Sequence, residues 1–219
     1  MLLVTLISIS ILPACQTLNE VLLSMLDSLR AMWPWEAIAV VSLLVYLVLA
    51  IRQNALCWPA AIIGTAIYVV LMFQVGLYME SALQLFYIGM AIYGWYTWRH
   101  GSGPNKQLLI TSWPLAFNIL PIAVIFAFTL ISGYLLATFT KAAMPYLDSF
   151  TTWAAVITTW MVARKILQNW HYWFVIDSIS VYLYVSRGLW LTAMLFVLYL
   201  VLILIGYRTW LQSAREQAC

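Results

Sequence analysis

The sequence predicts an all-α integral membrane protein, and three features of its composition predict this class. Of the 219 residues, 65% are hydrophobic and 8% are charged, against roughly 25% charged residues in soluble domains. The mean hydropathy of the chain is +0.96, which leaves room for several apolar stretches of about 20 residues, the length that crosses a bilayer. The net charge of +3 is not gathered into a basic face, so we expect a lipid bilayer and no nucleic acid as partner.

Seven intervals with almost no charged side chains predict seven transmembrane helices, because a helix surrounded by lipid is apolar on all sides. We expect the helices at residues 35–51, 58–77, 81–98, 113–137, 150–163, 169–186 and 189–210. Residues 1–34 are expected to form a separate segment on the outer side. Their start, MLLVTLISISILPAC, resembles a short signal sequence without its basic residues. An interfacial helix is the favoured alternative, because four leucines share one face: Leu22, Leu23, Leu26 and Leu29.

The distribution of lysine and arginine predicts the orientation, because short cytoplasmic loops are rich in both. Seven basic residues fall on one side of the predicted topology: Arg52, Arg99, Lys106, Arg164, Lys165, Arg208 and Arg215. Three fall on the other side: Arg30, Lys141 and Arg187. We therefore expect a cytoplasmic C-terminus and, with seven spans, an N-terminus outside. The acids expected mostly on the outer side agree with this orientation: Glu20, Asp27, Glu36, Glu80 and Asp148.

An internal repeat relates the two ends of the membrane part. At a longer interval, of 115, Gln53 matches Gln168, Asn54 matches Asn169, and Trp58 matches Trp173. After a gap of three positions, a shorter interval, of 112, matches Gly76 with Gly188, Leu83 with Leu195, Tyr87 with Tyr199, Gly94 with Gly206, and Trp98 with Trp210. The pattern predicts two parallel three-helix repeats, 35–98 and 147–212, joined by a linker helix within 107–140. This architecture is typical of transporters; a duplicated scaffold that moves nothing is the alternative.

One acid stands well inside a predicted span and is the main candidate for ligand binding. An aspartate at a helix centre costs about 2.5–3.5 kcal/mol on insertion scales and marks a functional site by default. Helical spacing puts it on one side of its helix with two indoles and two hydroxyls: Trp170, Trp173, Asp177, Ser180 and Tyr184. Indoles beside a carboxylate suit a flat organic cation. The alternatives are an interfacial position for Trp170 and hydrogen bonds from neighbouring helices for Asp177.

Other polar residues inside the predicted spans are weaker candidates. Gln84 shares a helix face with Ser81, Tyr87 and Ala91. Four threonines of the fifth span face either a substrate path or the carbonyls of their own helix: Thr151, Thr152, Thr158 and Thr159. Asn54 and Asn169 are expected to cap helices.

Motifs of soluble enzymes and pumps do not occur in the sequence. There is no GxxxxGK[ST], HExxH or GxSxG pattern. Cys15, Cys57 and Cys219 are too widely spaced to indicate a disulfide framework or a metal site. We therefore expect no enzyme activity, no cofactor and no metal, and passive movement of a substrate down its gradient.

Four segments closely resemble the Pnu vitamin transporters of bacteria: RQNALCWPAAIIGTAIY, GLYMESALQLFYIGMAIYGWYTW, RKILQNWHYWFVIDSISVYLY and GLWLTAMLFVLYLVLILIGYRTW. The likeness covers residues 35–212. It implies a 3+1+3 arrangement of helices similar to the SWEET sugar transporters, a homotrimer, and a place in the bacterial inner membrane. It also implies facilitated diffusion of an unphosphorylated vitamin, which a cytoplasmic kinase then traps by phosphorylation.

The resemblance extends to single residues. Trp170, Trp173 and Asp177 match the family motif near the vitamin site, and Gln84 matches a glutamine in the same relative place. Many nicotinamide riboside carriers have asparagine where this chain has Asp177, and some have an asparagine in the second helix, where this chain has Ile62-Ile63-Gly64-Thr65. An anionic site suits a permanent cation. The resemblance therefore favours thiamine as the substrate, with nicotinamide riboside as the alternative.

Overall fold

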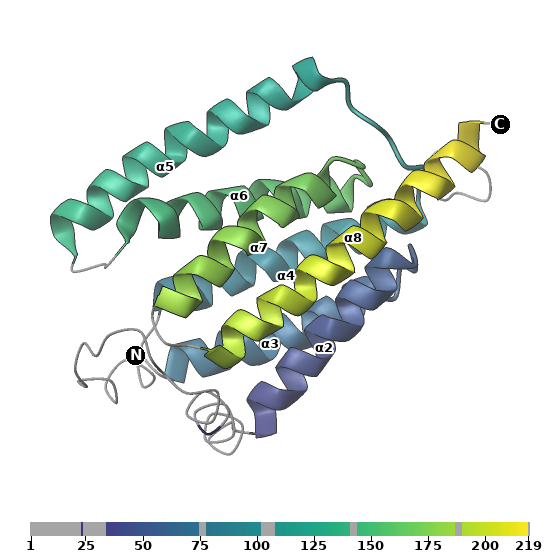
Figure 1. The fold of residues 1–219 in the computed structure, drawn as a ribbon. Coiled ribbons are helices and arrows are strands. Elements are labelled where there is room, and N and C mark those ends of the chain that lie inside the picture. The colour runs from purple at the N-terminus through teal and green to yellow at the C-terminus, as the bar shows by residue number, and fades with distance from the viewer. Residues whose placement is uncertain are drawn as a thin grey trace.

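The computed structural model describes residues 23, 34–74, 78–101, 108–140, 144–186 and 190–218. Their regular secondary structure is helical, as the sequence predicts (Figure 1). The α-helices are α2 (Pro34–Ile51), α3 (Cys57–Gln74), α4 (Tyr78–Arg99), α5 (Ile119–Phe139), α6 (Pro145–Ala163), α7 (Asn169–Ser186) and α8 (Trp190–Ala218), and a 3-10 turn, η2 (Leu115–Asn118), precedes α5. The expected N-terminal segment 1–34 lies outside the described residues, apart from Leu23 and Pro34.

Several helix boundaries differ from the prediction. The helix expected at 113–137 starts with the 3-10 turn at Leu115 and becomes α-helical only at Ile119. The helix expected at 81–98 begins three residues earlier, at Tyr78. The helix expected at 150–163 begins at Pro145, because proline fits the first turn of a helix and Asp148 lies within that turn instead of in a loop. The helix expected at 189–210 continues to Ala218, because polar residues beyond Trp210 extend it past the apolar stretch.

Four helical stretches are long and apolar enough to cross a membrane by length and composition: Pro34–Ile51, Cys57–Gln74, Leu115–Phe139 and Ala193–Gln217. The helices α4, α6 and α7 are not among them. They carry more polar side chains, including Gln84, the threonines of α6 and Asp177. Several of these side chains line a cavity inside the bundle and do not face outward. The mean hydropathy of a whole helix therefore underestimates how apolar the outer faces of α4, α6 and α7 are. Seven spans remain a prediction.

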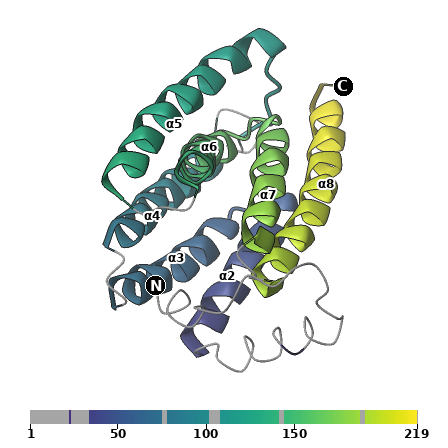
Figure 2. The same ribbon diagram turned by 60° about the vertical axis from the view of Figure 1, so that its left-hand side comes forward.

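Apart from α5, the helices fall in chain order into two sets of three, α2–α3–α4 and α6–α7–α8, which we call the two three-helix groups (Figures 1 and 2). The groups meet where α4 packs against α6 and where α2 packs against α8. Helix α5 packs on α6 at the edge of the bundle and takes no part in the contact between the groups. The space that both groups enclose is therefore bounded by six helices.

Most charged side chains of the described residues lie toward the two ends of the bundle; Asp177, within α7, and Glu216, among the basic residues near the end of α8, are the exceptions. The C-terminal ends of α2, α4, α6 and α8 lie together (Figure 1), and the basic residues are at or near them: Arg52, Arg99, Arg164, Lys165, Arg208 and Arg215. We call this the basic end. Glu36 and Asp148 lie in the first turns of α2 and α6, at the opposite end. The remaining basic residues used for the orientation lie outside the described residues: Arg30, Lys106, Lys141 and Arg187.

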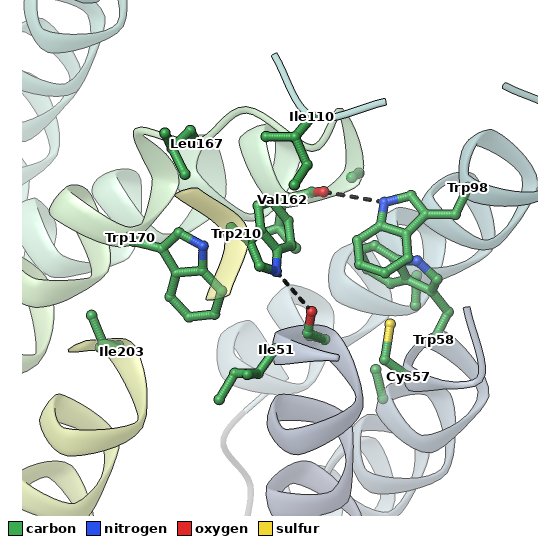
Figure 3. Packing of buried hydrophobic residues seen from close by; sticks show 14 residues of the cluster. Ile51, Cys57, Trp58, Trp98, Ile110, Val162, Leu167, Trp170, Ile203 and Trp210 are labelled. Atoms are coloured by element: carbon green, nitrogen blue, oxygen red, sulfur yellow. Dashed lines mark hydrogen bonds between the residues drawn. The ribbon is translucent and has the colours of Figure 1, made fainter. Parts of the chain in front are cut away.

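Four buried tryptophans form the core near the basic end (Figure 3). The ring centres of Trp58 and Trp98 lie 5.4 Å apart with an angle of 84° between the ring planes. Those of Trp170 and Trp210 also lie 5.4 Å apart, with an angle of 88° between the planes. Trp98 Nε1 donates to the carbonyl of Val162 at 3.2 Å, while Trp210 Nε1 donates to the carbonyl of Ala50 at 3.0 Å. Each hydrogen bond joins one three-helix group to the other.

These contacts correct the repeat alignment. Trp58 packs on Gly94, and Trp170 packs on Gly206, so that Trp170 is the counterpart of Trp58. The sequence comparison assigned this place to Trp173 through the longer interval. The helix bounds agree with the shorter interval, of 112. This interval relates Cys57 to Asn169, the first residues of α3 and α7, and Gln74 to Ser186, their last residues. The gap of three positions in the alignment was wrong. It was introduced to match Gln53-Asn54 with Gln168-Asn169, whereas the bounds of the helices match without a gap.

Candidate substrate-binding cavity

A cavity of about 440 Å³ lies between the two three-helix groups. Its volume falls within the range of about 300–1,000 Å³ that is usual for small-molecule sites. Side chains from α2, α3, α4, α6, α7 and α8 line it, and α5 contributes none. The polar and indole-bearing residues in its wall are Tyr46, Trp58, Thr65, Gln84, Tyr87, Thr151, Thr152, Thr159, Asn169, Trp170, Trp173, Asp177, Ser180 and Tyr199.

Asp177 is the acid of this wall. Its side chain lies on α7 and is 4% exposed. Among the described residues its carboxylate makes no hydrogen bond and no ion pair, and its interaction with Tyr199 on α8 is electrostatic only. The alternative in which neighbouring helices donate hydrogen bonds to Asp177 is therefore not what the structure contains. A buried carboxylate without such partners is costly unless a ligand supplies them.

The two indoles predicted beside Asp177 also line the cavity. Trp170 is buried and packs edge to face against Trp210, so it is a wall of the core and not an interfacial residue. Trp173 lies one turn before Asp177 on α7 and is partly buried. Together they give the part of the cavity beside the carboxylate an aromatic lining.

The other predicted residues divide between the cavity and its surroundings. Gln84 and Tyr87 line the cavity from α4, and Ser180 lines it from α7, with its hydroxyl donating to the Ile176 carbonyl. Tyr184 does not line it: its ring stacks on Phe196 at 5.1 Å. Tyr184 follows Asp177 by two helical turns and lies roughly 10 Å further along the helix axis, beyond the cavity. The correction is that Tyr184 supports the wall residue Phe196 instead of reaching the cavity.

The four threonines of α6 all bond to carbonyls of their own helix, and three of them also line the cavity. Each donates its hydroxyl to a carbonyl of its own helix, at 2.6–3.1 Å for the i−4 bonds. Thr151, Thr152 and Thr159 nevertheless line the cavity, while Thr158 does not. Because the hydroxyl hydrogens are engaged, these threonines can only accept hydrogen bonds from a ligand.

The two asparagines at the helix entries have different environments. Asn54 Oδ1 accepts from the backbone N–H of Leu56 at 2.9 Å, as expected of a capping residue. Asn169 is fully buried, donates to the Ile166 carbonyl at 2.6 Å and lines the cavity. Its Oδ1 has no hydrogen-bond partner in the part of the chain that the structure describes.

Sequence reasoning missed several wall residues, chiefly Tyr46, Trp58, Thr65 and Tyr199. The shorter repeat interval, applied to the whole chain, would have found two of them, because it relates Trp58 to Trp170 and Thr65 to Asp177. Tyr199 already matches Tyr87 at this interval, and the equivalence with a candidate residue was the signal for it. The two halves of the wall thus occupy equivalent positions, but the acid occurs in one half only.

No group of three histidine, cysteine, aspartate or glutamate side chains that could hold a metal ion occurs in the described ranges. The arrangement is suited to binding: a buried anion, aromatic faces and acceptor hydroxyls surround a space of ligand size.

Comparisons with known proteins relate the chain to transporters. The family model described as "Nicotinamide mononucleotide transporter" matches residues 33–212. The chain is 26% identical over 207 residues to the nicotinamide riboside transporter PnuC of Escherichia coli, covering 83% of this chain and 87% of that protein. It is 24% identical over 180 residues to the riboflavin/roseoflavin transporter RibM of Streptomyces davaonensis, covering 79% of this chain and 83% of that protein.

The fold is similar to that of a crystal structure of the vitamin B3 transporter PnuC, with a TM-score of 0.66 and 18% sequence identity. The likeness covers 92% of this chain and 94% of that chain. The family model spans all six helices that line the cavity, up to residue 212 of α8. The chain therefore belongs to the nicotinamide mononucleotide transporter family, a family of vitamin transporters in the membrane and not of enzymes.

Proposed function

We propose that the protein carries an unphosphorylated vitamin with a permanent positive charge across the membrane, down its concentration gradient. The observation that carries this proposal is the Asp177 carboxylate, which is buried in the wall of a 440 Å³ cavity and has no cationic partner in the part of the chain that the structure describes. A flat organic cation would supply the missing charge and stack on the indoles of Trp170 and Trp173. Gln84 and Tyr87 would face the same ligand from α4, with Ser180 beside Asp177 on α7.

Nicotinamide riboside is the first candidate substrate. Its pyridinium ring is flat and cationic, and it is the substrate named for the Escherichia coli relative. Thiamine is the second candidate, because its thiazolium is also a permanent cation and the chain has the acid Asp177 where many carriers of nicotinamide riboside have asparagine. Phosphorylation by a cytoplasmic kinase would trap either vitamin, so that the carrier itself needs no energy source.

The proposal includes an architecture and an orientation. We assign residues 35–98 and 147–212 to two parallel repeats in a SWEET-like 3+1+3 arrangement, with 107–140 as linker and 1–34 as the outer segment. The paired indole–glycine contacts and the paired indole hydrogen bonds support this assignment. The basic end would face the cytoplasm of the bacterial inner membrane, which puts the C-terminus inside and the N-terminus outside. We assign a homotrimer from the family resemblance alone.

Uptake by proteoliposomes tests the proposal. Radiolabelled nicotinamide riboside and thiamine would be offered separately to vesicles that contain the purified protein, without any ion gradient. We expect one of them to equilibrate across the membrane without being concentrated. Uptake of neither would favour a membrane scaffold that moves nothing, and accumulation that depends on Na⁺ or pH would favour a coupled transporter.

A further inference from the structure

The cavity is closed toward the basic end by contacts that cross between the two three-helix groups. Ala50 and Val162 line the cavity, and their carbonyls accept the hydrogen bonds from Trp210 and Trp98. Trp58 and Trp170 fill the space between these bonds and are 1% and 3% exposed. Figure 3 shows the indoles side by side across this end. A ligand in the cavity therefore has no route past them in this conformation.

The two helices that end here do so in the same strained way. Helix α2 is followed by Gln53 at φ 54°, and helix α6 by Lys165 at φ 51°. The backbone bonds are equivalent: Gln53 N–H donates to Ala50 and Lys165 N–H to Val162, at 3.0 and 2.9 Å. This is the arrangement in which a helix normally ends at glycine, because other L residues are disfavoured at such φ values.

The side chains at these two positions contact each other across the groups. Lys165 Nζ donates to Gln53 Oε1 at 3.3 Å and lies 4.7 Å from the centre of the Trp98 ring. Glycine would end both helices without strain, but it could not make this bridge. Strained residues that persist in a fold point to a function for their side chains.

One side of the bridge is anchored independently. The backbone of Thr111 donates to the Lys165 carbonyl at 3.0 Å and accepts from Leu167 at 2.9 Å. The segment before η2 thus holds the loop between α6 and α7. Besides the Lys165–Gln53 bridge and the two indole bonds, further contacts join the two groups at this end. Thr97 donates to the Ala163 carbonyl at 2.9 Å, Arg164 donates to the Tyr93 hydroxyl at 3.4 Å, and the Trp98 and Trp210 rings lie 6.0 Å apart.

We propose that the Lys165–Gln53 bridge, together with the crossed indole bonds of Trp98 and Trp210, is the gate at the basic end of the cavity. The bridge breaks when the two groups separate, and the ligand then leaves past Trp58 and Trp170. This inference rests on the proposed transport function, and it assigns to the chain the contacts that close one side of the substrate path.

Cross-linking tests the gate. Cysteines would replace Gln53 and Lys165 in a protein whose three native cysteines are changed to serine or alanine, and a short thiosulfonate reagent would join them. We expect the cross-linked protein to bind the vitamin as before but to lose at least about tenfold in uptake, with recovery after reduction. Unchanged uptake by the cross-linked protein would overturn the gate. Absence of binding and uptake before cross-linking would instead contradict the proposed function.

Labelling of the native Cys57 gives an independent readout. This thiol is fully buried at the start of α3 and interacts electrostatically with Lys165. In a protein with Cys15 and Cys219 changed to serine, Gln53→Met should raise the reaction rate of Cys57 with a maleimide about tenfold or more, because a lost hydrogen bond to a charged group shifts the opening equilibrium by this much. Lys165→Met should raise the rate less, because it also removes the positive charge that favours the reactive thiolate. Bound vitamin should slow the reaction again.

The matched control for labelling is Arg99→Met. Arg99 lies 4.4 Å from the Trp95 ring, a cation–π contact at the same end but within one helix. We expect its loss to leave Cys57 labelling unchanged. Equal labelling in the wild type and in both bridge variants would overturn the proposal.

Discussion

Gly206 lies directly against the indole of Trp170, so that a Cβ at this position would overlap the ring. Trp170 forms part of the cavity wall, and it cannot move away because Trp210 packs against it. We predict that Gly206→Ala lowers the free energy of unfolding by about 1–3 kcal/mol, as overpacking does, and weakens vitamin binding. Thermal unfolding in detergent and calorimetry measure the two effects.

Gly89→Ala is the matched control for this change. Gly89 lies on α4, and nothing would come within 4 Å of an added Cβ there. Alanine also favours the helix, so we expect an unchanged or slightly higher melting temperature and unchanged binding. If Gly206→Ala behaved like Gly89→Ala, the contact with Trp170 would not hold the cavity wall.

Replacing the buried acid should remove the charge partner of the vitamin. We predict that Asp177→Asn weakens binding of the cationic substrate about 10- to 100-fold, because interactions with a charged partner contribute about 1.5–3 kcal/mol. Asp148→Asn removes an equal charge from the first turn of α6, outside the cavity, and should leave binding unchanged. Equal affinities of Asp177→Asn and the wild type, measured by calorimetry, would remove Asp177 from the site.

Trp173 should bind the cationic ring of the vitamin through the face of its indole. We expect affinity for a cationic vitamin to fall in the order wild type, Trp173→Phe, Trp173→Leu, with a total loss of about 3- to 30-fold, since cation–π contacts contribute about 0.5–2 kcal/mol. If the leucine and phenylalanine variants bound equally well, Trp173 would act as an apolar spacer and not as a cation-binding face.

Burial lowers the pKa of Lys165, in the loop after α6, to about 8 from an ordinary value of 10.5. The Cys57 thiol is the titratable group that interacts with it and partly opposes this shift. Between pH 8 and 10.5 the unfolded chain binds a proton that the folded chain has lost, so Lys165 makes stability rise with pH in this window. Below pH 8 both states carry the proton and this stability is absent.

The Lys165→Met variant isolates this effect. We predict that the melting temperature of the wild type, measured relative to Lys165→Met, rises from about pH 8 to about pH 10 and stays constant below about pH 7. A constant difference across the whole range would show that Lys165 titrates normally in the folded protein.

Much of the fold could be predicted because the chemistry of a lipid-exposed helix is visible in composition. The interval 169–186 coincides with α7, since polar residues bound an apolar stretch on both sides. The start of α6 does not follow from charge-free intervals, because Asp148 bounds such an interval although both Pro145 and Asp148 fit a first helical turn.

The site was only partly predictable. Asp177 stands out in the sequence because an acid inside a span is rare, and its neighbours on α7 follow from helical spacing. Thr65 and Tyr199 carry no such signal, because threonine and tyrosine are frequent in the other helices of this chain. Their place in the cavity depends on how the two groups pack. The shorter repeat interval relates Tyr199 to Tyr87 and Thr65 to Asp177, and the longer interval obscured the second of these relations.

An experimental density map of the protein with bound vitamin tests whether the cavity is the substrate site. We expect the cationic ring inside the cavity between the two three-helix groups, with its charge within about 4 Å of the Asp177 carboxylate and its plane within about 6 Å of the Trp173 ring centre. Density for the vitamin outside this cavity, or inside it with the cationic ring turned away from Asp177, would show that Asp177 does not bind the substrate.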